Sequence, residues 1–104
     1  MNAAERLWRG LARHDWEAVR AQFHPSAEIE RPATHTRLDV DEFIAEHRVD
    51  AARGERDVEV LRSVADGKTS VIEARSGSAR CVGIYDLHDG RIAGATEYWV
   101  PPAP

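Results

Sequence analysis

Apolar residues in the first part of the chain recur every three or four positions, the spacing of one face of an α-helix. This pattern predicts a helix over residues 2–13 and a second short helix that begins after Asp15, a residue type that often caps helix N-termini. His24-Pro25 would end the second helix, because the residue before a proline avoids the helical region. The apolar positions of the two stripes are Leu7, Trp8, Leu11 and Ala12, then Trp16, Val19 and Phe23.

The middle of the chain predicts a short strand and then a third helix. Ala27–Arg31 alternates apolar and charged residues between two prolines, which is typical of a strand. We expect a loop at 33–38, followed by a helix that begins near Asp39 and ends by Gly54. Acidic residues fill the first turn of this helix, where the helix dipole favours negative charge. Its apolar stripe is Val40, Phe43, Ile44 and His47.

After Gly54 the apolar period changes to two, the period of a β-strand. Asp66-Gly67 and Asp89-Gly90 are dipeptides that favour tight hairpins. The four expected strands are Asp57–Ala65, Thr69–Arg75, Ala79–Leu87 and Arg91–Val100. Helices first and an antiparallel meander last indicate an α+β fold with the helices on one face of the sheet.

Composition narrows the classes of function. The length of 104 residues predicts one domain spanning 1–104. The formal net charge of −4 argues against a nucleic-acid or membrane-surface partner, since both require basic faces. Cys81 is the only cysteine, and the chain shows no signal-type or membrane-spanning apolar run. These features predict a cytoplasmic protein, and we expect no cofactor and no metal.

Three stretches resemble the SnoaL-like branch of the nuclear-transport-factor-2-like superfamily. They are HDWEAVRAQFHPSAEIERP (14–32), LDVDEFIAEHR (38–48), and VADG (64–67) with LHDGRIAGATEYWVPP (87–102). The resemblance implies a cystatin-like α+β cone, with about three N-terminal helices packed on a curved antiparallel sheet and a pocket between them. It also implies a homodimer through the outer sheet face, which we expect to include Ile72, Ala74, Thr96 and Tyr98.

The same superfamily includes ketosteroid isomerase, whose catalytic positions can be compared with this chain. Where isomerases of this type have a catalytic Asp before the proline that ends the first strand, this chain has Arg31. The position of their oxyanion-hole Tyr matches Leu7, and that of their second Asp matches Val82 or Gly83. None of these side chains can perform those roles, so we reject ketosteroid isomerisation. An Asp-Arg-Asp arrangement like that of limonene epoxide hydrolase is also missing from the sequence.

The resemblance and strand alternation together predict which side chains line the pocket. We expect Glu97, His47 and Glu73 as catalytic candidates and Arg31 and Arg75 as polar ligand-binding residues. The apolar wall would comprise Trp8, Trp16 and Trp99. Each has a structural alternative: Glu73 and Arg75 as a solvated face, His47 as a core or rim histidine, and the tryptophans as ordinary core.

Arg31 decides between the functional alternatives, because a permanent cation facing an apolar pocket needs a carboxylate or an anionic ligand. The resemblance implies that Glu97 is the best-placed carboxylate, with Glu73 second. An intact buried pair would form a neutral plug and argue against catalysis. An Arg31 side chain in an open cavity would instead hold a carboxylate or enolate oxygen. We expect a protein that binds a small apolar or carbonyl-containing molecule. The alternative is an enzyme of the polyketide cyclase, isomerase or hydratase type with a carboxylate base.

Overall fold

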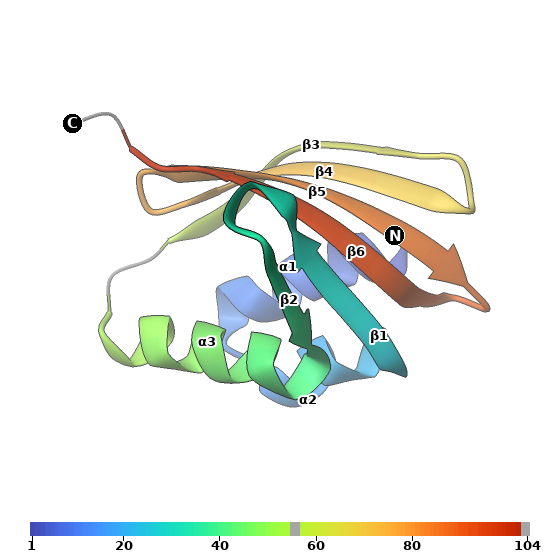
Figure 1. Cartoon of the computed structure of the whole chain (residues 1–104), viewed down its shortest axis with the longest axis horizontal. Coiled ribbons are helices and arrows are strands. Elements are labelled where there is room, and N and C mark those ends of the chain that lie inside the picture. The colour runs from blue at the N-terminus through green and yellow to red at the C-terminus, as the bar shows by residue number, and fades with distance from the viewer. Residues whose placement is uncertain (55–56, 103–104) are drawn as a thin grey trace.

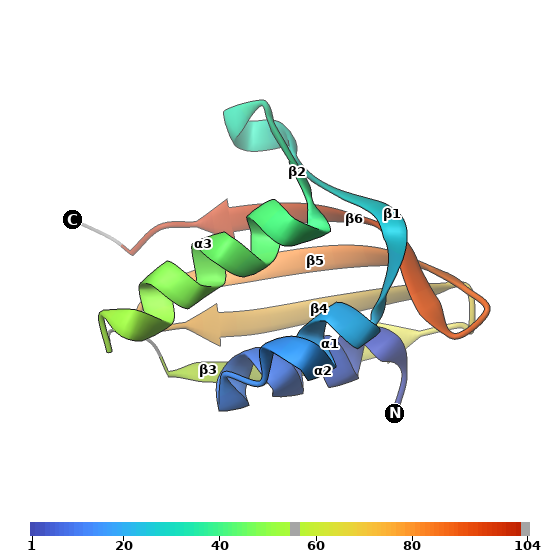
Figure 2. The ribbon, with the colours of Figure 1, turned by 90° about the horizontal axis from the view of Figure 1, so that it is seen from below.

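The computed structural model describes residues 1–54 and 57–102. In this part of the chain, three helices cover one face of a curved six-stranded sheet (Figures 1 and 2). The helices are α1 (Ala3–Arg13), α2 (Trp16–Ala21) and α3 (Val40–Ala52). The strands are β1 (Phe23–Arg31), β2 (Thr36–Asp39), β3 (Val58–Ala65), β4 (Thr69–Ser76), β5 (Ala79–His88) and β6 (Arg91–Val100). We call the face under the helices the inner face and the opposite face the outer face.

Side-chain caps fix where the helices begin. Asn2 and Glu5 form a reciprocal capping box at α1, and Asp39 and Glu42 form another at α3. Asp15 caps α2 by accepting a hydrogen bond from the Ala18 amide. The predicted start of the third helix near Asp39 is therefore confirmed.

The sheet places the first and last strands side by side. The strand order is β2-β1-β6-β5-β4-β3, and β1 pairs with β6 in parallel while the other neighbours are antiparallel. Ile29 of β1 is opposite Ala95 of β6, so the end of β1 lies beside the middle of β6. This pairing carries Arg31 toward Glu97, although the two residues are 66 positions apart in the chain.

Two boundaries differ from the sequence prediction. Phe23, expected in the second helix, begins β1 instead, because Gln22 accepts a hydrogen bond from the Ile92 amide and Phe23 packs edge-on against Phe43. The predicted loop at 33–38 contains a 3-10 turn (Pro32–Thr34) and most of β2, which pairs with β1. Both differences arise from pairing between strands that are distant in the sequence. The local pattern of apolar residues does not reveal such pairing.

The predicted orientation of β4 is wrong. Ile72 pairs with Gly83, which pairs with Glu97, so Ile72 shares the inner face with Glu97 and is fully buried together with Ala74. Val71, Glu73 and Arg75 therefore lie on the outer face. There Glu73 bonds with Arg62 and Arg80, and Arg75 with Glu59, in solvent. The expected orientation would bury two charged side chains instead.

The outer face carries two exposed apolar pairs beside these ion pairs. Val64 is opposite Val71, and Val82 is opposite Tyr98, all on the outer face and all at least one-third exposed. Ile72 and Ala74, expected here, do not contribute. No helix among the described residues is long and apolar enough to cross a membrane.

Candidate functional site

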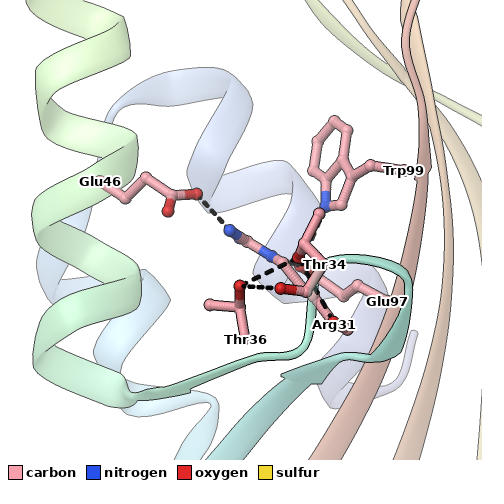
Figure 3. A network of polar contacts seen from close by, with 6 residues as sticks. All are labelled: Arg31, Thr34, Thr36, Glu46, Glu97 and Trp99. Atoms are coloured by element: carbon pink, nitrogen blue, oxygen red, sulfur yellow. Dashed lines mark hydrogen bonds and ion pairs between the residues drawn. The ribbon is translucent and has the colours of Figure 1, made fainter.

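Arg31 and Glu97 meet on the inner face of the sheet. Arg31 is the last residue of β1 and Glu97 lies in the middle of β6; the Nε atom of Arg31 donates to Oε1 of Glu97 at 3.1 Å (Figure 3). Glu97 is 1% exposed and the Arg31 side chain 14% exposed. Of the two arrangements that the sequence analysis left open for Arg31, the structure has the intact, buried pair with Glu97.

A second carboxylate, which the sequence analysis missed, holds the other side of the guanidinium. Nη1 of Arg31 donates to Oε1 of Glu46 at 2.6 Å, and Glu46 comes from α3 (Figure 3). Arg31 thus links β1 to α3 and to β6. The sequence contains no local Asp-Arg-Asp arrangement, yet the fold forms a carboxylate–guanidinium–carboxylate bridge from three distant positions.

Aromatic side chains complete the surroundings of Glu97. Trp99 Nε1 donates to Oε1 of Glu97 at 3.1 Å, and the Trp99 ring packs 6.3 Å from that of Trp8. Trp8 Nε1 in turn donates to the hydroxyl of Tyr85 at 2.7 Å. Trp8 and Trp99, predicted as the apolar wall, therefore lie at this site and also donate hydrogen bonds.

Tyr85 is the second residue that the sequence analysis missed. Its hydroxyl lies over Gly83, where a Cβ would come within 2.3 Å of it. Gly83 pairs with Glu97, so Tyr85 and Glu97 are neighbours on the inner face. The alternation of Cys81, Gly83 and Tyr85 along β5 was the signal that could have placed Tyr85 here, since these residues share one face.

Burial dominates the electrostatics of the site. It raises the pKa of Glu97, and the opposing effects of Arg31 and the Trp99 hydrogen bond are smaller. Burial, followed by the charge of Glu97, also raises the pKa of Tyr85 and of Cys81. Burial alone would lower the pKa of Arg31, but Glu97 and Glu46 outweigh it and raise the value. Arg31 is therefore cationic at any physiological pH, while Cys81 and Tyr85 are neutral.

The Arg31–Glu97 bridge has one hydrogen bond, whereas a bidentate arginine–carboxylate pair has two. Nη2 of Arg31 and Oε2 of Glu97 are both buried, and neither has a hydrogen bond among the described residues. Nε and Nη2 lie on the same edge of a guanidinium, whose donors have a fixed geometry. The side chain thus directs Nη2 to the same side as its bond to Glu97. The two paired side chains thus leave one donor and one acceptor open.

The remaining predicted residues lie elsewhere. His47 packs against Phe43 with ring centroids 4.5 Å apart. His47 and Trp16 line a hollow of about 20 Å³, with neither Arg31 nor Glu97 among its described lining residues. Glu73 and Arg75 are on the outer face, so the prediction that they share the site with Glu97 is wrong.

The positions compared with ketosteroid isomerase carry no acid or base other than Arg31. Leu7 is buried in the core, and Val82 is on the outer face. The inner side of Gly83 is covered by the Tyr85 hydroxyl. Among the described residues, no group of three or more His, Cys, Asp or Glu side chains is arranged to hold a metal ion.

One open hollow of about 380 Å³ adjoins this cluster, because Arg31 is among its lining residues. A groove of about 440 Å³ lies between the ends of α2, β1 and α3, with Phe23, His24 and Arg91 in its lining. None of the predicted site residues lines it. Between the helices and the sheet, the space around Glu97 is occupied by the buried side chains of Trp8 and Tyr85 and the largely buried one of Arg31.

Comparison with known proteins identifies the family. Residues 4–95 match the model of the SnoaL-like domain. The chain therefore belongs to the SnoaL-like family, as its resemblance implied. A search of curated proteins finds no match.

Solved structures show the same fold at low sequence identity. A proposed ketosteroid isomerase from Kribbella flavida is 23% identical, with a TM-score of 0.76 over 98% of this chain and 80% of that one. IdmH, a proposed polyketide cyclase from Streptomyces antibioticus, is 18% identical, with a TM-score of 0.80 over 93% of this chain and 88% of that one. An LEH-like epoxide hydrolase from M. tuberculosis is 22% identical, with a TM-score of 0.70 over 94% and 80%. At these sequence identities the likeness shows the fold alone, because one fold hosts many activities.

Proposed function

We propose that this protein binds a small carbonyl-containing molecule on the inner face of the sheet, at the Arg31–Glu97 pair. The observation that carries the proposal is the buried Nη2 donor of Arg31, which has no hydrogen bond. Leaving a buried donor unsatisfied costs about 1–3 kcal/mol, and more when the group is charged. A ligand carbonyl oxygen would accept this hydrogen bond, while the half-buried ring of Trp99, packed against Trp8, would contact the rest of the molecule.

Entry to the site requires movement of α3. Glu97 is 1% exposed, so a ligand cannot reach it in the closed form. The Arg31–Glu46 hydrogen bond joins the site to α3, and the Glu46 side chain is 44% exposed. Phe43 and Ile44 of α3 are buried in the core, so only a small displacement of this helix, and hence a small ligand, fits this route.

The buried pair favours binding over catalysis. Glu97 already receives hydrogen bonds from Arg31 and Trp99 on Oε1. Glu73, the other proposed base, is on the outer face. A second candidate function, an enzyme of the cyclase, isomerase or hydratase type, is favoured by one observation. Oε2 of Glu97 is open, and burial raises the pKa of this carboxyl, as suits a general base.

Calorimetric titration with acetophenone tests the binding proposal. We expect the wild-type protein to bind this ketone and the double variant Arg31→Met/Glu97→Gln to bind at least tenfold more weakly. Replacing both members of a buried ion pair by neutral residues of similar volume generally preserves folding. Arg37→Met, which removes an exposed arginine paired with Glu30, is the matched control and should bind as the wild type does. No binding by the wild type, or equal binding by the double variant, contradicts the proposal.

Hydrogen–deuterium exchange distinguishes binding from catalysis. A general base at Glu97 would remove a proton from the methyl group of bound acetophenone, and D₂O would return deuterium. Binding without catalysis predicts that NMR shows the uncatalysed exchange rate. Acceleration that Glu97→Gln abolishes would establish the enzymatic alternative.

A further inference from the structure

Two buried atoms of the site have no hydrogen bond: Nη2 of Arg31, a donor, and Oε2 of Glu97, an acceptor. This combination narrows the class of ligand. Resting on the proposed function, we infer that the ligand is a hydroxy-ketone, in which a carbonyl oxygen and a hydroxyl group are on neighbouring carbon atoms. The carbonyl oxygen accepts from Nη2 of Arg31, and the hydroxyl donates to Oε2 of Glu97.

The other polar atoms of the pair are occupied. Nε of Arg31 bonds to Glu97, and Nη1 bonds to Glu46. Oε1 of Glu97 receives both Arg31 and Trp99. A ligand therefore meets one available nitrogen on Arg31 and one available oxygen on Glu97. Glu46 and Trp99 help to define this arrangement, because each occupies an atom that a ligand would otherwise use.

The charges of the pair exclude the other simple carbonyl ligands. A plain ketone satisfies Nη2 but leaves Oε2 of Glu97 buried without a donor. A carboxylate anion also satisfies Nη2, but it places a second negative charge beside the Glu97 carboxylate, which is unfavourable. A hydroxy-ketone satisfies both atoms without adding charge. Sites with buried polar groups of this kind discriminate strongly against ligands that leave one of them unpaired.

Water does not remove this selectivity. A water molecule bridging Nη2 and Oε2 would accept from the first and donate to the second, as the hydroxy-ketone does. A ligand that displaces an ordered water without reproducing its hydrogen bonds loses affinity. The preference for a donor next to an acceptor thus holds whether the closed site is dry or hydrated.

Three probes with the same phenyl ring test the inference by calorimetry at neutral pH: α-hydroxyacetophenone (the hydroxyl on the carbon next to the carbonyl), acetophenone and benzoate. We expect the wild-type protein to bind α-hydroxyacetophenone at least tenfold more tightly than acetophenone, and benzoate more weakly than either. Acetophenone binding that equals or exceeds α-hydroxyacetophenone binding overturns the inference while leaving the proposed function intact. If no probe binds, the proposed function fails and this inference fails with it.

A conservative variant assigns the preference to Glu97. In Glu97→Gln the amide oxygen must face Arg31 and Trp99, which are both donors, so the amide nitrogen replaces Oε2. A nitrogen donor there cannot accept from the ligand hydroxyl and can only donate to its oxygen, in a neutral hydrogen bond that is weaker than the charge-assisted one to a carboxylate. We expect the preference for α-hydroxyacetophenone over acetophenone to fall several-fold in Glu97→Gln, and the control Arg37→Lys to keep the wild-type ratio. A wild-type ratio in folded Glu97→Gln, verified by circular dichroism, contradicts the assignment.

Discussion

Replacing Arg31 by alanine isolates the energetic role of the buried pair. The substitution leaves the Glu97 carboxylate, 1% exposed, beside the Trp99 indole and the Tyr85 hydroxyl but without its cationic partner. Removing one partner of a buried ion pair costs about 3–5 kcal/mol, because the other charge stays buried. Domains of this size unfold with free energies of about 5–15 kcal/mol, so the variant should lose a large part of its stability.

Two matched variants separate this effect from the loss of any arginine. Arg37→Ala breaks an ion pair whose side chains are 62% and 49% exposed and should cost about 1 kcal/mol or less. In a Glu97→Gln background no buried charge is left behind, so Arg31→Ala should cost at least about 2 kcal/mol less than in the wild type. Urea unfolding, followed by tryptophan fluorescence and circular dichroism, measures the free energy of unfolding of all five proteins: the wild type, the three single variants and the double variant.

The pH dependence gives an independent signature of the same carboxylate. The pKa of Glu97 is raised in the folded protein, so the folded state holds its proton more tightly than the unfolded state. The contribution of Glu97 to stability is then greatest below the unfolded value of about 4.3 and is lost as the pH rises through the folded value. Arg31→Ala removes an interaction that lowers this pKa. The free energy of unfolding should therefore decrease more steeply with rising pH in this variant, by up to about 1.4 kcal/mol per pH unit. A variant within about 1 kcal/mol of wild type at pH 7, with an unchanged pH profile, would refute this reasoning.

Three further predictions concern the surroundings of the site and the outer face. Tyr85→Phe removes the acceptor of the buried Trp8 indole and should cost about 1–3 kcal/mol in urea unfolding, whereas exposed Tyr98→Phe should cost little. Gly83→Ala places a Cβ 2.3 Å from the Tyr85 hydroxyl and should cost about 1–3 kcal/mol. Gly94→Ala, whose nearest neighbour lies 3.8 Å away, is its control, and equal effects would argue against the close packing. We predict a homodimer through the outer face, with Tyr98→Glu yielding monomers in sedimentation equilibrium; a monomeric wild type at micromolar concentration would disprove it.

Local pattern predicted the elements that local interactions determine. The helices α1 and α3 follow from apolar spacing and capping residues, and the hairpins at Asp66-Gly67 and Asp89-Gly90 from turn chemistry. The short strand β2 and the strand position of Phe23 were not predictable in this way. Both depend on pairing with residues of β1 or β6, and a short segment carries no signal of its distant partner.

The site residues could be predicted where the strand register of the family applied. They could not be predicted where tertiary packing determines which side chains meet. The Arg31–Glu97 pair followed from the resemblance. Glu73 was placed on the wrong face because alternation states which residues share a face but not which face is buried. Glu46 was missed because an exposed helical glutamate looks like any solvated charge until the fold brings it to Arg31.

A crystal structure of the protein soaked with α-hydroxyacetophenone tests the central claim most directly, because it locates both ligand oxygens. We predict that the carbonyl oxygen lies within hydrogen-bond distance of Nη2 of Arg31 and the hydroxyl within hydrogen-bond distance of Oε2 of Glu97, with α3 displaced from Arg31. A ligand bound only in an outer groove, with the buried Arg31–Glu97 pair unchanged and no ligand beside it, would contradict the account.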